Sequence, residues 1–141
     1  MSALSVGVPT EIKPDERRVA VTPDGVTELV SHDVEVLVQA GAGAGIGIAD
    51  DAYRVAGAEV VDTAEEVWAR AGLVCKVKEP QASELVLLRE DMTLFTYLHL
   101  AAYPAVAEAL CAAGTTGIAY ETVMRADGLL PLLAPMSEIA G

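Results

Sequence analysis

The strongest constraint on the fold is the regular alternation of short apolar runs with segments of helical periodicity. We expect strands over residues 6–8, 34–38, 59–61, 73–77, 93–98 and 116–119. Helices are expected between them, over residues 23–32, 50–55, 63–72, 83–88 and 104–113, with a last helix starting at 135. Strands that alternate with helices form βαβ units, so the pattern predicts a mainly parallel α/β sheet covered by helices on both faces.

Local signals place the start of two helices. Thr63, followed three positions later by Glu66, is typical of a capping box, in which the threonine hydroxyl accepts a hydrogen bond from a free amide of the first turn. Either Asp50 or Asp51 is expected to cap the helix before it. These boundaries leave a glycine-rich segment between the strand over 34–38 and the helix that starts near residue 50.

Composition and charge exclude several classes of protein. Apolar residues make up 52% of the 141-residue chain, which is enough for a core and excludes disorder throughout. The net charge of −12 argues against nucleic acid or an anionic membrane surface as a partner, because both need basic patches. No apolar stretch approaches the ~20 residues of a membrane span. The first residues lack the positive segment of a secretory leader, so we expect a cytoplasmic protein.

The cysteines and histidines predict no metal centre. Cys75 and Cys111 each stand in an apolar run, so both are expected to be buried, reduced thiols. The chain has two histidines and no CxxC or HxxxH spacing, which argues against zinc.

The glycine-rich loop invites a dinucleotide-binding interpretation that its spacing does not support. The segment QAGAGAGIGIADDAY (39–53) follows an expected strand and precedes an expected helix. The G-x-G-x-x-G fingerprint would need a third glycine where Ile46 or Ile48 stands. The spacing instead predicts a tight turn with closely packed glycines.

Two pairs of basic residues are candidate anion-binding groups. Arg17 and Arg18 close a polar stretch, and either they are solvated or one guanidinium turns inward to bind a carboxylate. Lys76 and Lys78 flank Val77, so strand alternation would place both on one face. Lys78 would meet an anion at the carboxyl end of its strand, where open parallel sheets bind ligands. The alternative is an edge strand with both lysines in water.

His99 is a candidate for proton transfer because it follows an expected strand at its carboxyl end. A neutral imidazole near pH 7 suits that role, although a histidine beside apolar residues is as often structural. The other histidine, His32, is expected to cap the carboxyl end of a helix.

Six ordered stretches resemble the family of alanine dehydrogenases and transhydrogenase N-terminal domains, and the chain is most similar in pattern to alanine dehydrogenase. They are GVPTEIKPDERRVAVTP (7–23), QAGAGAGIGIADDAY (39–53), KVKEP (76–80), TYLHLAA (96–102), IAYETV (118–123) and LLPLLAPMSEIAG (129–141). The resemblance covers only the first part of a longer family chain.

The resemblance implies roles for matching positions. Arg18 and Lys78 match residues that bind the substrate carboxylate, and His99 matches the catalytic acid/base. Ser137 matches a serine that contacts the cofactor, NAD. Two further residues are implied to line or support the cleft, Glu121 and Met136. The implied reaction is the reversible oxidative deamination of L-alanine to pyruvate and ammonia.

The resemblance also implies an organisation into domains. Residues 1–134 are expected to form the N-terminal part of a substrate-binding, catalytic domain with an open, mainly parallel Rossmann-like sheet that is incomplete at its carboxyl end. Residues 135–141 are expected to start an interdomain helix that stops before the main NAD-binding domain, so the isolated chain should be inactive. The full-length form is expected to be a homo-oligomer. Two alternatives stay open, the NAD-binding subunit of proton-translocating transhydrogenase and a non-catalytic truncated remnant.

Overall fold

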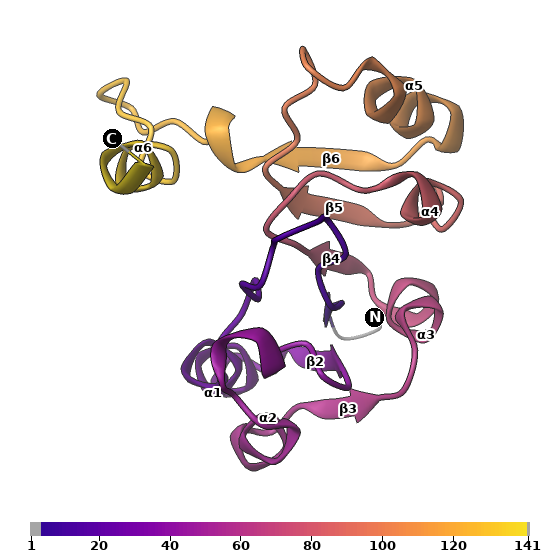
Figure 1. Cartoon of the computed structure of the whole chain (residues 1–141), viewed down its shortest axis with the longest axis vertical. Coiled ribbons are helices and arrows are strands. Elements are labelled where there is room, and N and C mark those ends of the chain that lie inside the picture. Colours follow the sequence, from indigo (N-terminus) through magenta and orange to yellow (C-terminus); the bar gives the residue numbers. More distant parts are fainter. Residues whose placement is uncertain (1–3, 141) are drawn as a thin grey trace.

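The computed structural model describes residues 4–140, which form one six-stranded sheet with helices on both sides (Figure 1). Every neighbouring pair of strands is parallel, and the order across the sheet is β3-β2-β1-β4-β5-β6. The strands are β1 (Ser5–Val8), β2 (Glu35–Gln39), β3 (Glu59–Val61), β4 (Leu73–Cys75), β5 (Thr93–Thr96) and β6 (Thr116–Ala119). The predicted open parallel α/β sheet is confirmed.

The helices cover the two faces of the sheet and close two separate cores. They are α1 (Pro23–Ser31), α2 (Asp50–Ala56), α3 (Ala64–Arg70), α4 (Ala82–Leu85), α5 (Pro104–Ala113) and α6 (Ala134–Ala140), with short 3₁₀ turns η1 (Ala44–Ile46) and η2 (Tyr120–Thr122). Val26 of α1 and Tyr53 of α2 are buried in one core, and Trp68 of α3 and Leu110 of α5 are buried in the other. Each strand of the centre is therefore covered from both sides, as its continuous apolar sequence predicts.

Two strands end earlier than the apolar runs predict. The run over 73–77 forms a strand only to Cys75, and the run over 93–98 only to Thr96. Beyond Cys75 the neighbouring strand β1 cannot extend the ladder, because Pro9 follows Val8 and has no amide hydrogen to donate. On its other side the chain stays bound to the β5 segment, since the Lys76 amide donates to the Phe95 carbonyl at 2.9 Å and the Tyr97 amide donates to the Val77 carbonyl at 3.3 Å.

Of the two hydrogen bonds that make up a capping box, one is formed at the start of α3. The Thr63 hydroxyl accepts from the Glu66 amide at 3.2 Å, as predicted. The Glu66 carboxylate binds Arg70 one turn later, at 2.9 Å, instead of returning to the cap. The helix ends at Arg70, two residues before the predicted end.

The glycine-rich loop is a packed turn. A Cβ atom on Gly45 would lie 2.6 Å from the carbonyl oxygen of Arg17, so only glycine allows this approach between two backbone segments. The expectation that an aspartate caps α2 is wrong, because Ala49 holds the cap position and Asp50 is the first helical residue. The Asp50 carboxylate instead accepts from the Gly41 amide at 2.9 Å and ties the loop to the helix.

The two cysteines differ in environment. Cys75 is buried at the end of β4, but the expectation for Cys111 is wrong, because it is exposed on α5. Val106 and Leu110 lie one turn apart and turn their side of α5 to the core, so the next residue faces solvent. None of the described helices is long and apolar enough to cross a bilayer.

Candidate functional site

The order of strands creates a crevice between β1 and β4. From β1 the chain builds the sheet outward through β2 and β3, then returns to place β4 on the other side of β1 and continues to β5 and β6. Ligands of open α/β sheets bind beyond the carboxyl ends of the strands at such a reversal. Two segments leave the sheet there, which we name the arm (residues 9–22, after β1) and the lysine segment (residues 76–81, after β4).

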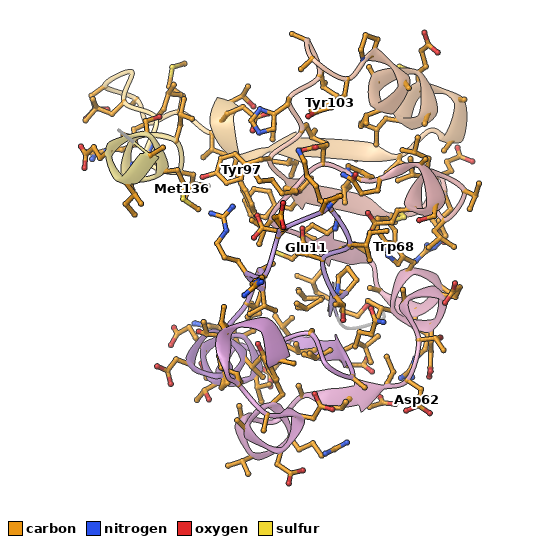
Figure 2. All side chains as sticks on the ribbon, in the orientation of Figure 1. Glu11, Asp62, Trp68, Tyr97, Tyr103 and Met136 are labelled. Carbon is orange, nitrogen blue, oxygen red and sulfur yellow. The ribbon has the colours of Figure 1, made fainter. Side chains whose placement is uncertain are left out.

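One cavity of about 300 Å³ collects the residues singled out from the sequence. It is lined by Arg18, Lys78, Tyr97, His99, Leu133, Met136, Ser137, Ile139 and Ala140. Tyr97 lies just beyond β5 and Met136 lies on α6, and Figure 2 shows the two close together between the sheet and that helix. Two cationic groups, one imidazole and one hydroxyl in an otherwise apolar wall suit a small anionic ligand.

Arg18 reaches the cavity with most of its guanidinium already bound. Its Nε and Nη2 atoms donate to the two carboxylate oxygens of Glu16, at 2.9 and 2.6 Å, and Nη1 lies 3.6 Å from the Met136 sulfur. The Arg18 hydrogen bonds hold the pKa of Glu16 below its usual value, and the same bonds raise the pKa of Arg18. Both arginines are exposed, Arg18 over 45% of its side chain, and of the two it is Arg18 that lines the cavity.

The two lysines do not share a face, contrary to the alternation argument. Lys76 is 1% exposed, and its Nζ lies 3.0 Å from Glu11 Oε2 and 3.2 Å from Glu84 Oε2. Lys78 lines the cavity. The solvated-edge alternative is wrong, because β4 lies inside the sheet, between β1 and β5.

The main chain of Lys78 is held on both sides. Its amide donates to Glu11 Oε1 at 2.8 Å, and its carbonyl accepts from Thr96 Oγ1 at 2.8 Å. Sequence reasoning missed Glu11, because nothing distinguishes it from the other charged residues of the arm. The one available signal was Lys76, since a lysine buried in a sheet requires a carboxylate partner.

His99 has an unusual backbone that a carboxylate supports. Its φ of 48° lies in the left-handed region, which non-glycine residues seldom adopt. The amides of Leu98 and His99 both donate to Glu121 Oε1, each at 3.0 Å. The His99 ring stacks on Tyr97 with 6.1 Å between centroids. His32, as expected, caps the end of α1.

Tyr97 is a second residue that sequence reasoning did not single out. Its hydroxyl donates to the Leu132 carbonyl and so attaches the segment before α6 to the sheet. Burial raises the pKa of Tyr97, which keeps the phenol protonated as this hydrogen bond requires. Tyr120 packs edge-on against it at 4.8 Å.

The described residues offer little to a metal ion or to a pyrophosphate. Within residues 4–140, no three His, Cys, Asp or Glu side chains converge in a way that could hold a metal ion. The glycine-rich loop does not fit a pyrophosphate, because Gly45 is closed against the arm rather than open to a ligand. Ser137 lines the cavity from α6, where a ligand on that side could reach it.

The fold and the cavity define an α/β domain with a small, partly cationic cavity at the reversal point of a parallel sheet. Residues 7–140 match the family model described as "Alanine dehydrogenase/PNT, N-terminal domain". The chain belongs to this family, which confirms the resemblance seen in the sequence.

Individual relatives agree with the family match. The chain is 59% identical to the alanine dehydrogenase of Mycolicibacterium smegmatis over 96% of its own length and 37% of that protein. It is 54% identical to the alanine dehydrogenase of Bacillus subtilis, over 96% of this chain and 35% of that one. The chain thus spans little more than a third of these relatives.

Solved structures give the same result. An L-alanine dehydrogenase structure superposes with a TM-score of 0.93 at 48% identity, over 97% of this chain and 38% of that one. The transhydrogenase from Sinorhizobium meliloti superposes with a TM-score of 0.80 at 31% identity, over 87% of this chain and 35% of that one. Alanine dehydrogenase is therefore the better supported of the two relationships.

Proposed function

We propose that the chain is the substrate-binding part of an NAD-dependent alanine dehydrogenase. The overall reaction converts L-alanine, NAD⁺ and water into pyruvate, ammonium, NADH and a proton, and it is reversible. The observation that supports this proposal best is the convergence of Arg18, Lys78 and His99 on one small cavity at the reversal point of the sheet.

The two cationic groups would bind the carboxylate of pyruvate or alanine. Glu16 occupies two nitrogen atoms of Arg18, which leaves Nη1 for the substrate. Lys78 supplies a second, mobile ammonium group, and its main chain is fixed by hydrogen bonds. The apolar side chains of Leu133 and Met136 would face the methyl group. Charge-assisted bonds of this kind orient a carboxylate as well as hold it.

His99 would exchange a proton with the oxygen at C2 of the substrate. When the imine is hydrolysed, water adds to C2 and the neutral imidazole takes the proton that this water loses. In the amination direction, the imidazolium returns that proton as the oxygen leaves C2 as water. A group with a pKa near neutrality suits both directions.

NAD is the cofactor that we propose for the complete enzyme, with Ser137 as its contact in this chain. The described residues provide no phosphate-binding turn, so the main NAD site would lie outside residues 4–140. In the same way we propose that residues 1–134 belong to the substrate domain and 135–141 lead out of it. The isolated chain would then be inactive, and the full-length form a cytoplasmic homo-oligomer.

Turnover in the full-length protein that contains this chain tests the proposal. Pyruvate and ammonium should together drive the oxidation of NADH, and Lys78→Ala should lower kcat/KM for pyruvate about 100-fold, or ~3 kcal/mol. Arg54→Ala is the matched control, because Arg54 is an exposed cation paired with Asp51 on α2. Pyruvate binding without turnover in the unsubstituted protein would instead support the non-catalytic remnant.

The incompleteness of the isolated chain has its own test. Purified residues 1–141 with L-alanine and NAD⁺ should form no NADH. Formation of NADH by this chain alone would show that it holds a cofactor site.

A further inference from the structure

A buried ion pair links the arm to the lysine segment. Lys76 is enclosed completely, and the carboxylates that face it come from two distant parts of the chain, Glu11 in the arm and Glu84 in α4. Charged groups are seldom fully buried, because the free energy lost when they leave water usually exceeds the free energy gained from a single ion pair. The position of this pair, next to Lys78, suggests what it does.

We propose that Glu11, held by Lys76, is a positioning residue that fixes the backbone of Lys78 for substrate binding. This inference rests on the proposed function, because it concerns the same cavity. Glu11 does not line that cavity and would act through Lys78, whereas Lys76 lines the adjoining cavity that shares Arg18 and Tyr97 with it.

The two oxygens of Glu11 have different partners. Oε2 accepts from the Lys76 ammonium at 3.0 Å, and Oε1 accepts from the Lys78 amide at 2.8 Å. Thr96 Oγ1, from β5, donates to the Lys78 carbonyl. The peptide groups on both sides of Lys78 are therefore bound, one to the arm and one to the strand that leads to His99.

Glu84 serves a local purpose in the same cluster. Its Oε1 accepts from the Gln81 amide at 2.9 Å and completes the capping box of α4. Burial raises the pKa of Glu84, and the Lys76 ammonium offsets part of that rise. Glu11 is thus the carboxylate that connects Lys76 to the substrate cavity.

A second contact joins the same two segments. The Lys13 ammonium, two residues beyond Glu11, binds the buried carboxylate of Glu79 in the lysine segment. The arm is therefore held at two points before it reaches Arg18. The geometry makes the placement of the two substrate-binding cations depend on each other, although they are 60 positions apart in the sequence.

Two double variants of the full-length protein separate positioning from stability. In E11Q/K76M the glutamine carbonyl can still accept from the Lys78 amide, whereas in E11M/K76M that acceptor is lost. Both variants remove the Glu11 charge and the Lys76 ammonium, and both leave Glu84 without its cation, so any loss of stability from the buried charges is common to the two. We expect the KM for pyruvate to rise about tenfold in E11M/K76M and to stay within about twofold of the parent in E11Q/K76M.

The controls decide between the possible outcomes. The exposed pair variant E59Q/R70M, on β3 and α3, should keep the parent KM. Equal KM values in E11M/K76M and E11Q/K76M, at equal thermal stability, would overturn the positioning role. An unchanged KM in Lys78→Ala would overturn the proposed function instead. Should E11M/K76M fail to fold, Glu11→Asp keeps the charge beside Lys76 but shortens the side chain that reaches the Lys78 amide, and a parent KM in that variant would overturn the inference.

Discussion

At the scale of single residues, ligand binding in the cavity depends on which donor atoms of each cationic side chain remain available to a ligand. Arg18 is oriented by two bonds to Glu16, and this fork cannot be reproduced by a lysine. Glu121 plays a comparable part for His99 by accepting two successive amides. The residues proposed to bind the ligand are thus each held by a carboxylate that does not line the cavity.

Arg18→Lys should weaken substrate binding although the charge is kept. A lysine cannot bind Glu16 in two places and also reach the cavity, so we expect the KM for pyruvate to rise about tenfold or more. Arg17→Lys, one position earlier and exposed, is the matched control and should leave KM unchanged. Equal effects of the two substitutions would contradict the assigned orientation of Arg18.

The two thiols should react at very different rates with an alkylating reagent. Burial raises the pKa of Cys75, which lowers its thiolate fraction, whereas Cys111 is exposed. Mass spectrometry of residues 1–141 should show modification of Cys111 first and of Cys75 only on unfolding. Rapid modification of Cys75 under native conditions would be inconsistent with this packing.

At the scale of elements, the site is built by the segments after the strands rather than by the strands themselves. The arm, the lysine segment and the residues after β5 leave the sheet at one edge. The glycine-rich loop packs against the arm at Arg17. A substitution that breaks a contact between these segments should therefore lower the free energy of unfolding.

Gly45→Ala should displace the arm. The added Cβ would lie 2.6 Å from a backbone oxygen of Arg17, which cannot move away as a side-chain end could. We expect a loss of about 1–3 kcal/mol in the free energy of unfolding, measured by urea denaturation. Gly72→Ala is the control, because its nearest neighbour is 3.6 Å away. A neutral Gly45→Ala would show that the arm is not packed on this loop.

The contact between Lys13 and Glu79 should make stability fall in acid. Burial is the largest single effect and would raise the pKa of Glu79, but the hydrogen bond and charge of Lys13, together with a backbone hydrogen bond, outweigh it and the pKa is lowered. A lowered carboxyl pKa stabilises the fold above the ordinary value of 4.5, and this stabilisation is lost as the pH falls below it. Denaturant titrations from pH 7 to pH 3 should show a smaller acid loss in Lys13→Met than in the parent. Identical pH dependence in both would exclude the contact.

Sequence patterns predicted the elements better than the ends of the elements. Strands over 59–61 and 116–119 and the helix over 104–113 have the bounds that apolar periodicity predicts. The ladder between β1 and β4 cannot continue past Val8 because Pro9 follows it, and such a limit set by a neighbouring segment is not encoded locally.

At the scale of the whole molecule, the reversal of strand order between β1 and β4 creates the site. It brings residues of the arm beside residues more than sixty positions later, such as Glu11 beside Lys76. Lys78 and His99 could be singled out from their places after apolar runs, whereas the family resemblance chose Arg18 over Arg17 and supplied Ser137. Glu11, Glu16 and Tyr97 could not, because their roles depend on partners that only the folded chain brings into contact.

A crystal structure of the full-length protein with pyruvate bound tests the central claim most directly. The account predicts the pyruvate carboxylate within about 3 Å of Lys78 Nζ and Arg18 Nη1, with the C2 oxygen facing His99. Pyruvate bound at another place, or a cavity without pyruvate at saturating concentration, would contradict it.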